Sequence, residues 1–471
     1  MNSPNSAVSR RMSPWYWRSL TGLIALALIV TSVTVVLVWH ELDCQSKLAS
    51  DMDRARALGV VVDNESMTQR YRERSTMSGS QEWGEIANLV STRILSSRTA
   101  WFDATEFTND RLHPSKLQQS EFKGSEEYYQ TLGAFLDEIQ PVIAQIKKLK
   151  TTGRPVWQPI HFEGFGTLLP SLQNSRSVMH LLGLEFEYAV HIVDRERAMQ
   201  AVDAMQNCID ACDFSFCYVS KLVNIACVEL QYMAIRKSLD SSIWTAEDLS
   251  QLMAKMNRPM DIPREWKDMV DGELAMAMQS ELNDFMYFDS DAPRFVIETR
   301  WLLSLGWKLP SIRKYVWDET QKYRNLADAG LDGLGERAHK LEVALEAEKN
   351  GSWNATLFSQ MTGSKSSVAK ALEGHDMVRR LTLTSIASKR YRLEKGQWPT
   401  QLSDLAVFGL SERDWQYKSG SPFGYHVEED GKSALLWGNS IRETEPANLE
   451  KLREDMETES HANYWAKVTT P

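Results

Sequence analysis

The sequence is poor in cysteine, in basic runs and in the short motifs that carry known chemistry. Five cysteines in 471 residues are too few for a fold built on disulfides, and their odd number leaves at least one thiol unpaired within the chain. No Lys/Arg-rich stretch stands out against the net charge of -10, which argues against a nucleic-acid partner. The sequence has no His-Glu-x-x-His, phosphate loop, Gly-x-Ser-x-Gly or dinucleotide fingerprint. It therefore assigns no catalytic, cofactor-binding or metal-ligating residue.

The few cysteines are placed as small apolar residues. Cys208, Cys212 and Cys227 fall on apolar stripes at helical spacing, which predicts buried thiols. Cys212 and Cys217 flank a predicted helix turn and could bridge if the compartment is oxidising. Cys44 lacks the small residues that normally precede a lipidated cysteine. The pairing of the five thiols is left open.

Only one long apolar run is present at the start of the chain, from Leu20 to Trp39. No charged side chain lies between Arg18 and His40, and a helix of this length, at about 1.5 Å per residue, covers the roughly 30 Å of a bilayer core. We therefore expect a single transmembrane helix with the lipid bilayer as its partner. The exit lacks small residues at the spacing of a cleavage site, so a retained anchor is favoured over the alternative, a removed signal peptide.

The charges on the two flanks of this run predict its orientation. Arg10, Arg11 and Arg18 precede it without any acidic residue, whereas Glu41 and Asp43 follow it. By the positive-inside rule, the short N-terminus stays in the cytoplasm and the bulk of the chain lies outside it. The expected location is the cell (inner) membrane, in a single pass.

Beyond the anchor, apolar residues recur at intervals of three and four, which predicts a mainly α fold. Successive amphipathic helices joined by short turns pack antiparallel, so we expect a helical-hairpin, solenoid-like ectodomain. The predicted helices are Cys44 to Leu58, Trp83 to Leu95, Tyr128 to Leu149 with a kink at Pro141, Val178 to Val193, Ala198 to Cys212, Val219 to Ala234, Thr245 to Met256, Glu265 to Asp284, the glycine-weakened Ser311 to Glu348, and Ser364 to Leu393.

The expected organisation has six parts. They are a cytoplasmic N-terminus (1–19), the transmembrane helix (20–39), a membrane-proximal helical region (40–150), a central helical-hairpin domain (151–363), a C-terminal helix with a small sheet (364–442), and a charged tail, loose or helical (443–471). Within the central domain, Arg294 to Leu309 carries many apolar residues between basic ones. A core helix is the favoured interpretation of this segment, and a helix lying on the membrane or on a partner is the alternative.

The last predicted helix ends in a segment with clear turn chemistry, Arg390-Tyr-Arg-Leu-Glu-Lys-Gly-Gln-Trp-Pro-Thr-Gln-Leu-Ser-Asp-Leu405. Gly396 can adopt the left-handed conformation that stops a helix, and Thr400 can cap a short second helix. Three alternating segments follow, with Asp430 and Gly431 placed for a tight hairpin. The sequence thus predicts a small C-terminal α+β module with an antiparallel hairpin.

This C-terminal segment resembles one shared by type II secretion pseudopilins and by a group of uncharacterised bacterial proteins, each anchored by one N-terminal helix and mostly helical outside the membrane. The resemblance implies an architecture and a cell-envelope (periplasmic) location, and it brings no catalytic residues. A pseudopilin carries a Gly-Phe-Thr-Leu-Ile-Glu type processing site ahead of its apolar helix. Here that helix is entered through Trp17-Arg18-Ser19-Leu20.

A few polar residues are weak candidates for chemistry. Glu187 and His191 are four residues apart on one predicted helix, with His180 farther up, and a surface pair is favoured over a metal site. Asp289 and Asp291 resemble the opening of a calcium loop without its later ligands. Other candidates are a carboxylate pair among Met and Ala, Glu273 and Glu281, and the 16 tryptophans, which suit either a binding groove or a core.

Three functions are compatible with these features. The favoured one is a non-enzymatic envelope scaffold that binds another protein through its stacked helices. A hydrolase of envelope polymers would need acidic residues converging in a Trp-lined cleft with opposing pKa shifts. A secretion-system component follows from the C-terminal resemblance alone.

Overall fold

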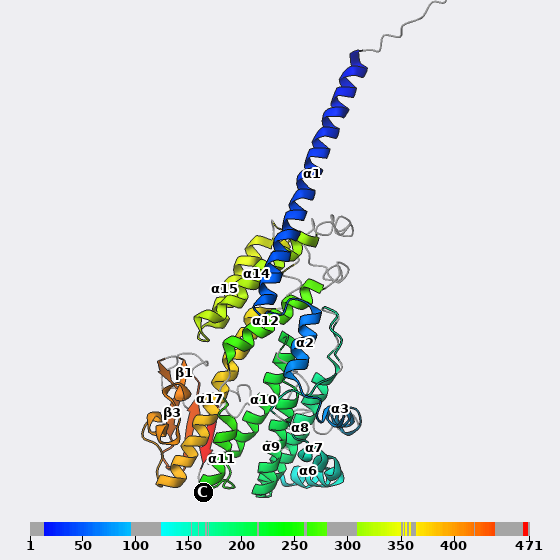
Figure 1. Ribbon diagram of the computed structural model, residues 1–471. Coiled ribbons are helices and arrows are strands. Elements are labelled where there is room, and N and C mark those ends of the chain that lie inside the picture. The colour runs from blue at the N-terminus through cyan, green and yellow to red at the C-terminus, as the bar shows by residue number, and fades with distance from the viewer. Residues whose placement is uncertain are drawn as a thin grey trace, which may run out of the picture.

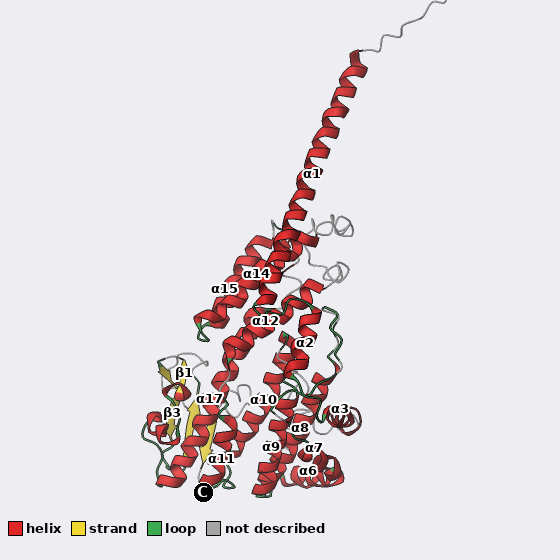
Figure 2. Cartoon of the chain, in the orientation of Figure 1, coloured by secondary structure: helices red, strands yellow, loops and turns green. Residues whose placement is uncertain are grey.

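A computed structural model describes residues 14–95, 124–279, 309–349, 364–438 and 465–469, together with residues 352, 354, 355 and 358. Residues 152, 159, 165, 166, 168, 214, 215, 259, 260 and 419 inside these ranges are not described. The described part is mainly helical, with a small antiparallel sheet near the C-terminus (Figure 2). Most of Arg294 to Leu309 lies outside the described residues, so its predicted role stays a prediction.

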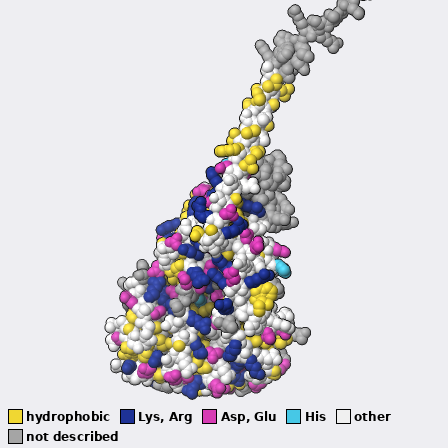
Figure 3. All heavy atoms as spheres, in the orientation of Figure 1, with side chains coloured by type: hydrophobic (Ala, Val, Ile, Leu, Met, Phe, Trp, Pro, Cys, Tyr) yellow, Lys and Arg dark blue, Asp and Glu magenta, His cyan; other side chains and the backbone are white. Residues whose placement is uncertain are grey.

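The first helix, α1, runs without interruption from Pro14 to Ala57, over 44 residues. It contains the one helix segment in the described part of the chain that is long and apolar enough to cross a membrane, and none of its most apolar window is buried. Figure 1 shows this part of α1 standing clear of the body, and Figure 3 shows its apolar surface in contrast to the mixed charges elsewhere. The predicted membrane-competent helix is therefore present.

The second half of α1 belongs to the body. Leu48 and Ala55 are buried in a core shared with later helices. The carboxylate of Glu41 accepts a hydrogen bond of 3.0 Å from the backbone N–H of Ser311 in the first turn of α14 (Leu309–Asn325), where unpaired N–H groups favour an anion. Asp51 lies 3.4 Å from Lys314 of the same helix. The anchor and the body thus share one rigid element.

The remaining helices follow in chain order, most of them near their predicted positions. They are α2 (Asn64–Arg74), α3 (Ser80–Leu89), η1 (Val90–Leu95), α6 (Glu126–Glu138), α7 (Gln140–Lys148), α8 (Pro170–His191), α9 (Arg195–Ala211), α10 (Tyr218–Ser238), α11 (Ala246–Met256), α12 (Ile262–Gln279), α14, η3 (Leu326–Ala329), α15 (Leu334–Lys349), α17 (Lys365–Lys395), η4 (Leu402–Phe408) and η5 (Glu412–Trp415).

Several predicted boundaries are confirmed by their caps. Thr245 accepts from the N–H of Asp248 and starts α11, and Gly396 ends α17 at a φ of 72°. The break at Ile139 separates α6 from α7 just before Pro141. The prediction that Thr400 caps the short second helix was wrong, because Gln401 is the residue that precedes η4. The Asp404 carboxylate accepts hydrogen bonds from the backbone N–H groups of Thr400 and Gln401.

Helix α17 connects two apolar cores. Its first turns contribute Val368 and Leu372 to a core with α1, α12, α14 and α15, whereas Leu381 and Ile386 join a larger core with α8 to α11 and the sheet. Almost every side chain of its first 25 residues is at least partly buried. Figure 1 shows α17 running from the anchor side of the body to the sheet.

The C-terminal sheet has three antiparallel strands in the order β3-β4-β5, namely β3 (Gly424–Val427), β4 (Ser433–Trp437) and β5 (Trp465–Thr469). A second pair, β1 (Gln416–Lys418) and β2 (Ser421–Pro422), lies beside it. The predicted hairpin is confirmed, with Gly431 at a φ of 62°. The prediction of a loose or helical tail was wrong for residues 465–469, because Ala466 and Val468 alternate into the core next to α17.

Candidate functional site

A group of buried ionisable side chains lies where α10, α12, α14, α15 and α17 meet. Lys365, the first residue of α17, is 2 % exposed. Its ammonium lies 4.6 Å from the ring centroid of Tyr323 and 4.4 Å from that of Phe358, which places the cation against two aromatic faces. Burial lowers the pKa of Lys365 to about 7, against the attraction of Glu273, Glu342 and Glu319.

Glu273 lies on α12 in this cluster and is buried. Its carboxylate accepts a 2.9 Å hydrogen bond from the N–H of Tyr218 in the first turn of α10. Burial raises the pKa of Glu273, which the N–H of Tyr218 and the charge of Lys365 partly offset. Its predicted companion Glu281 lies outside the described residues.

Each carboxylate of this cluster is used by the fold. Glu342 accepts from the N–H of Ser366, 2.8 Å away, and so caps α17 as Glu273 caps α10. The hydroxyl groups of Tyr218 and Tyr323 are buried without a hydrogen-bond partner. The arrangement holds Lys365 between two aromatic rings and near three carboxylates.

A second buried group lies farther along α17, beside the sheet. His375 is 3 % exposed and stacks on Tyr232 of α10, and burial lowers the pKa of His375 to about 3. The next residue, Asp376, accepts from Arg380 at 2.9 Å and from Arg379 at 3.2 Å. Arg380 in turn donates to backbone carbonyl groups of η5 and β1. This network joins α17 to the C-terminal module.

A third buried polar group holds three helices of the lower body together. Glu185 of α8 is fully buried and accepts from Lys147 at 2.6 Å and from Arg197 at 2.7 Å. Burial alone would raise the pKa of Glu185, but the hydrogen bonds and charges of Arg197 and Lys147 hold it below its usual value. Removal of one partner would leave a buried charge uncompensated.

Three of the five cysteines form a cluster between α9 and α10. Cys208, Cys212 and Cys227 are all buried, as their spacing predicts, and all are free thiols. Interactions with Cys208 and Cys227 lower the pKa of the Cys212 thiol, whereas the pKa values of Cys208 and Cys227 are raised by Cys212 and by burial. Cys217 caps α10 together with Ser220. The bridge between Cys212 and Cys217 in an oxidising compartment stays a prediction, and both are free thiols in this structure.

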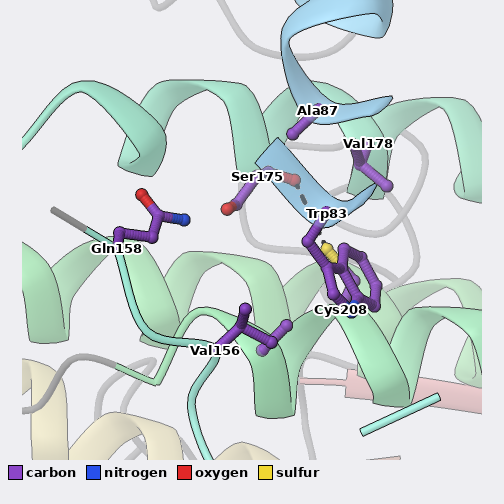
Figure 4. Close-up of a pocket in the computed structure, with 8 residues that line it drawn as sticks. Trp83, Ala87, Val156, Gln158, Ser175, Val178 and Cys208 are labelled. Atoms are coloured by element: carbon purple, nitrogen blue, oxygen red, sulfur yellow. Dashed lines mark hydrogen bonds between the residues drawn. The ribbon is translucent and has the colours of Figure 1, made fainter. Parts of the chain in front are cut away.

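A small cavity adjoins this cluster. It has room for about one water molecule and is lined by Trp83 and Ala87 of α3, Val156, Gln158, Ser175, Val178, Cys208 and Ala211. Figure 4 shows the side chains of Trp83, Ser175 and Cys208 around this space. The indole N–H of Trp83 is buried without a hydrogen-bond partner, and Cys208 donates weakly to the Ser175 carbonyl at 3.7 Å.

The helix-surface histidine is engaged with its neighbours. The imidazole of His191 stacks on Tyr129 at 3.6 Å between ring centroids, and its Nε2 lies 3.7 Å from Glu126. Glu187 interacts with the Tyr129 hydroxyl. Among the described residues, no three His, Cys, Asp or Glu side chains are placed to hold a metal ion. Asp289 and Asp291 lie outside those residues.

Several tryptophans of the described residues fill cores. Trp244, Trp266, Trp317 and Trp398 are buried, whereas Trp39 at the end of the apolar segment is 68 % exposed. Sequence reasoning missed Lys365, His375 and the ion pairs of Glu185. The one signal in the sequence was the position of these polar residues on the apolar face of a predicted helix, because a buried polar residue requires a partner.

No protein-family model, curated protein or solved structure matches this chain.

Proposed function

We propose that this protein is an extracytoplasmic helical scaffold of the bacterial cell envelope, anchored by a single transmembrane pass, which holds a protein partner at the end of its body farthest from the bilayer. The observation that carries the proposal is α1. Its apolar half stands free of the body, and its polar half is fixed in a core by Leu48, Ala55 and the Glu41 contact to α14.

The orientation rests on charge. Arg10, Arg11 and Arg18 precede the apolar segment, and Glu41 and Asp43 follow it, which favours an N-terminus in the cytoplasm and a body outside it. The buried carboxylates favour a scaffold over a hydrolase of envelope polymers. Glu273 and Glu342 cap helices, and Glu185 is held between two cations, so these acids support the fold.

The surface proposed for the partner is the turn between α8 and α9. Consecutive helices here pack as a hairpin, and the proposed solenoid-like stack would present such turns in a row. His191 reaches Glu126 of α6 and Arg195 lies 3.5 Å from Asp248 of α11, and Figure 1 shows α6 and α11 at the end of the body opposite the anchor.

Two features of this turn favour a binding role. Ile192 and Val193 are 43 % and 63 % exposed, although both are large apolar residues. Val193 has a φ of 58°, a conformation that costs a β-branched residue about 1–2 kcal/mol. Residues held in strained backbone conformations cluster at functional sites, so the exposed and strained Val193 favours a binding role for this turn.

The test places a photoreactive amino acid at Val193 in the full-length protein in its native membrane, with a second one at Lys340 as control. Lys340 is 72 % exposed on α15, on the anchor side of the body. We expect one defined adduct from position 193 alone, confirmed by reciprocal purification of the identified partner. Val193→Gly should stabilise the fold and weaken this association.

Equal labelling at both positions, or none at 193, would contradict the proposed surface. A reporter fused after Pro471 that is active only in the cytosol would contradict the orientation.

A second candidate function is a secretion-system component. The observation that favours it is the C-terminal module, in which α17 ends at Gly396 and leads through η4 into the β3-β4 hairpin, in the order of the pseudopilin-like segment. Co-purification with secretion machinery that is lost when residues 397–471 are removed would support this candidate over the first.

A further inference from the structure

The exposed apolar pair of the α8–α9 turn, Ile192 and Val193, lies between two other helices. On one side, the imidazole of His191 lies 3.7 Å from the carboxylate of Glu126 in the first turn of α6. On the other side, Arg195 lies 3.5 Å from a carboxylate in the first turn of α11. Figure 1 shows α6 and α11 at the same end of the body as this turn. The N-terminal ends of α6 and α11 therefore flank the apolar pair.

The helices that begin around this pair have acidic first turns. The acidic side chains are Glu126 and Glu127 in α6, Glu196 in α9, and Glu247 and Asp248 in α11. Such residues stabilise the N-terminus of their own helix, and they also add negative charge to the surface. Glu127, Glu196 and Glu247 are exposed, and none of the three forms an ion pair with a basic side chain among the described residues.

The cations nearest to the turn are engaged within the fold. Arg195 lies against Asp248, and Arg197 is held at 2.7 Å by the buried carboxylate of Glu185. The exposed carboxylates therefore make the surface around the apolar pair predominantly negative. This surface repels anionic polymers, such as phosphate-bearing lipids and polysaccharides, and attracts a cationic partner by charge complementarity.

We infer that the protein partner presents to this turn a basic segment, in which lysine or arginine flanks an apolar side chain. The inference rests on the proposed function, because it names the chemistry of the partner at the surface proposed above. The apolar side chain packs on Ile192 and Val193, and the flanking cations pair with Glu196 and Glu247. An apolar centre with a charged rim is the common arrangement of a protein–protein interface.

The experiment uses the full-length protein with the photoreactive amino acid at position 193, in isolated native membranes. The double variant Glu196→Gln, Glu247→Gln removes two charges beside the apolar pair. The double variant Glu336→Gln, Glu346→Gln removes two exposed charges on α15 and is the matched control. We expect the first to lower the yield of the adduct by about three- to tenfold and the control to leave it unchanged.

Salt provides a second measurement that needs no substitution. Raising the salt concentration from about 0.1 M to about 1 M shortens the screening length from about 10 Å to about 3 Å, so the yield at position 193 should fall. Sequencing of the cross-linked partner peptide identifies its chemistry directly. We expect lysine or arginine on either side of an apolar residue. Thermal unfolding curves of both double variants separate loss of charge from loss of fold.

The possible failures of this inference and of the proposed function differ. A protein adduct that forms equally in both double variants and at both salt concentrations, or a partner peptide that is acidic, would overturn the inference and leave the proposed function standing. A lipid or polysaccharide adduct, or no adduct at position 193, would overturn both. If the first double variant unfolds, the salt series and the partner sequence decide the outcome.

Discussion

At the scale of single residues, the main feature is that two ionisable groups, Lys365 and His375, are buried in the first third of α17. Lys365 and His375 are ten residues apart, and burial lowers the pKa of each below its ordinary value. Both are therefore protonated more readily in the unfolded chain than in the folded one, over different ranges of pH. The free energy of unfolding should depend on pH through each of them.

Lys365 acts in the alkaline range. Its pKa is about 7 in the fold against 10.5 for a free lysine. Burial of this lysine therefore lowers the free energy of unfolding most at pH 7 and below, and this cost disappears as the pH rises to 10.5. We expect Lys365→Met to raise the free energy of unfolding by about 2–4 kcal/mol at pH 7, with the gain shrinking toward pH 10. Urea unfolding of the full-length protein in micelles measures it, and Lys340→Met on the exposed face of α15 is the control.

His375 acts in the acidic range. Its pKa is about 3 in the fold against 6.5 for a free histidine, so the stability it contributes is present above pH 6.5 and is lost toward pH 3. His375→Phe keeps the ring stacked on Tyr232 and removes the titration, and it should raise the free energy of unfolding by about 2–4 kcal/mol at pH 4. The exposed His339→Phe should change nothing, and equal acid sensitivity of both variants would refute the prediction.

At the scale of elements, close approach between α12 and the start of α10 depends on one glycine. A Cβ on Gly272 would overlap the carbonyl group of Phe216, a backbone atom that has no room to move. We expect Gly272→Ala to destabilise the protein by more than about 3 kcal/mol. Gly374→Ala on α17 is the matched control, because nothing lies within 4 Å of its Cβ position and alanine favours the helix by about 1 kcal/mol.

Thermal unfolding followed by circular dichroism distinguishes these two variants. Similar melting temperatures for both would mean that α12 and α10 are free to move apart.

The same scale shows what sequence patterns can and cannot predict. Helices α8 to α11 were predictable because their apolar stripes and caps, such as Thr245, are local. Strand β5 was missed because its five residues follow a charged stretch and gain their partner, β4, from a distant segment. The environments of Lys365 and Cys208 were missed for the same reason, since each is made by several helices that meet only in the fold.

At the scale of the whole molecule, the C-terminal strand β5 is the third strand of the sheet and joins the sheet to the helical body. The N–H of Thr469 donates to the carbonyl of Leu239 at the end of α10, and β5 pairs along its length with β4. Removal of residues 465–471 should lower the melting temperature and cause aggregation, because it exposes β4 as an edge and uncovers α17. Removal of residues 470–471 alone should have little effect, and size-exclusion chromatography separates the outcomes.

Helix α1 runs from Pro14 to Ala57 without a break. It therefore fixes the rotation of the body about the helix axis as well as the distance of the body from the apolar segment. Each residue inserted between the apolar half and Glu41 would turn everything beyond it by about 100° and raise it by about 1.5 Å. Under the proposed anchoring, a partner held in the same bilayer would then meet a different side of the molecule. The number of residues in this one helix therefore determines in which direction each face of the body points.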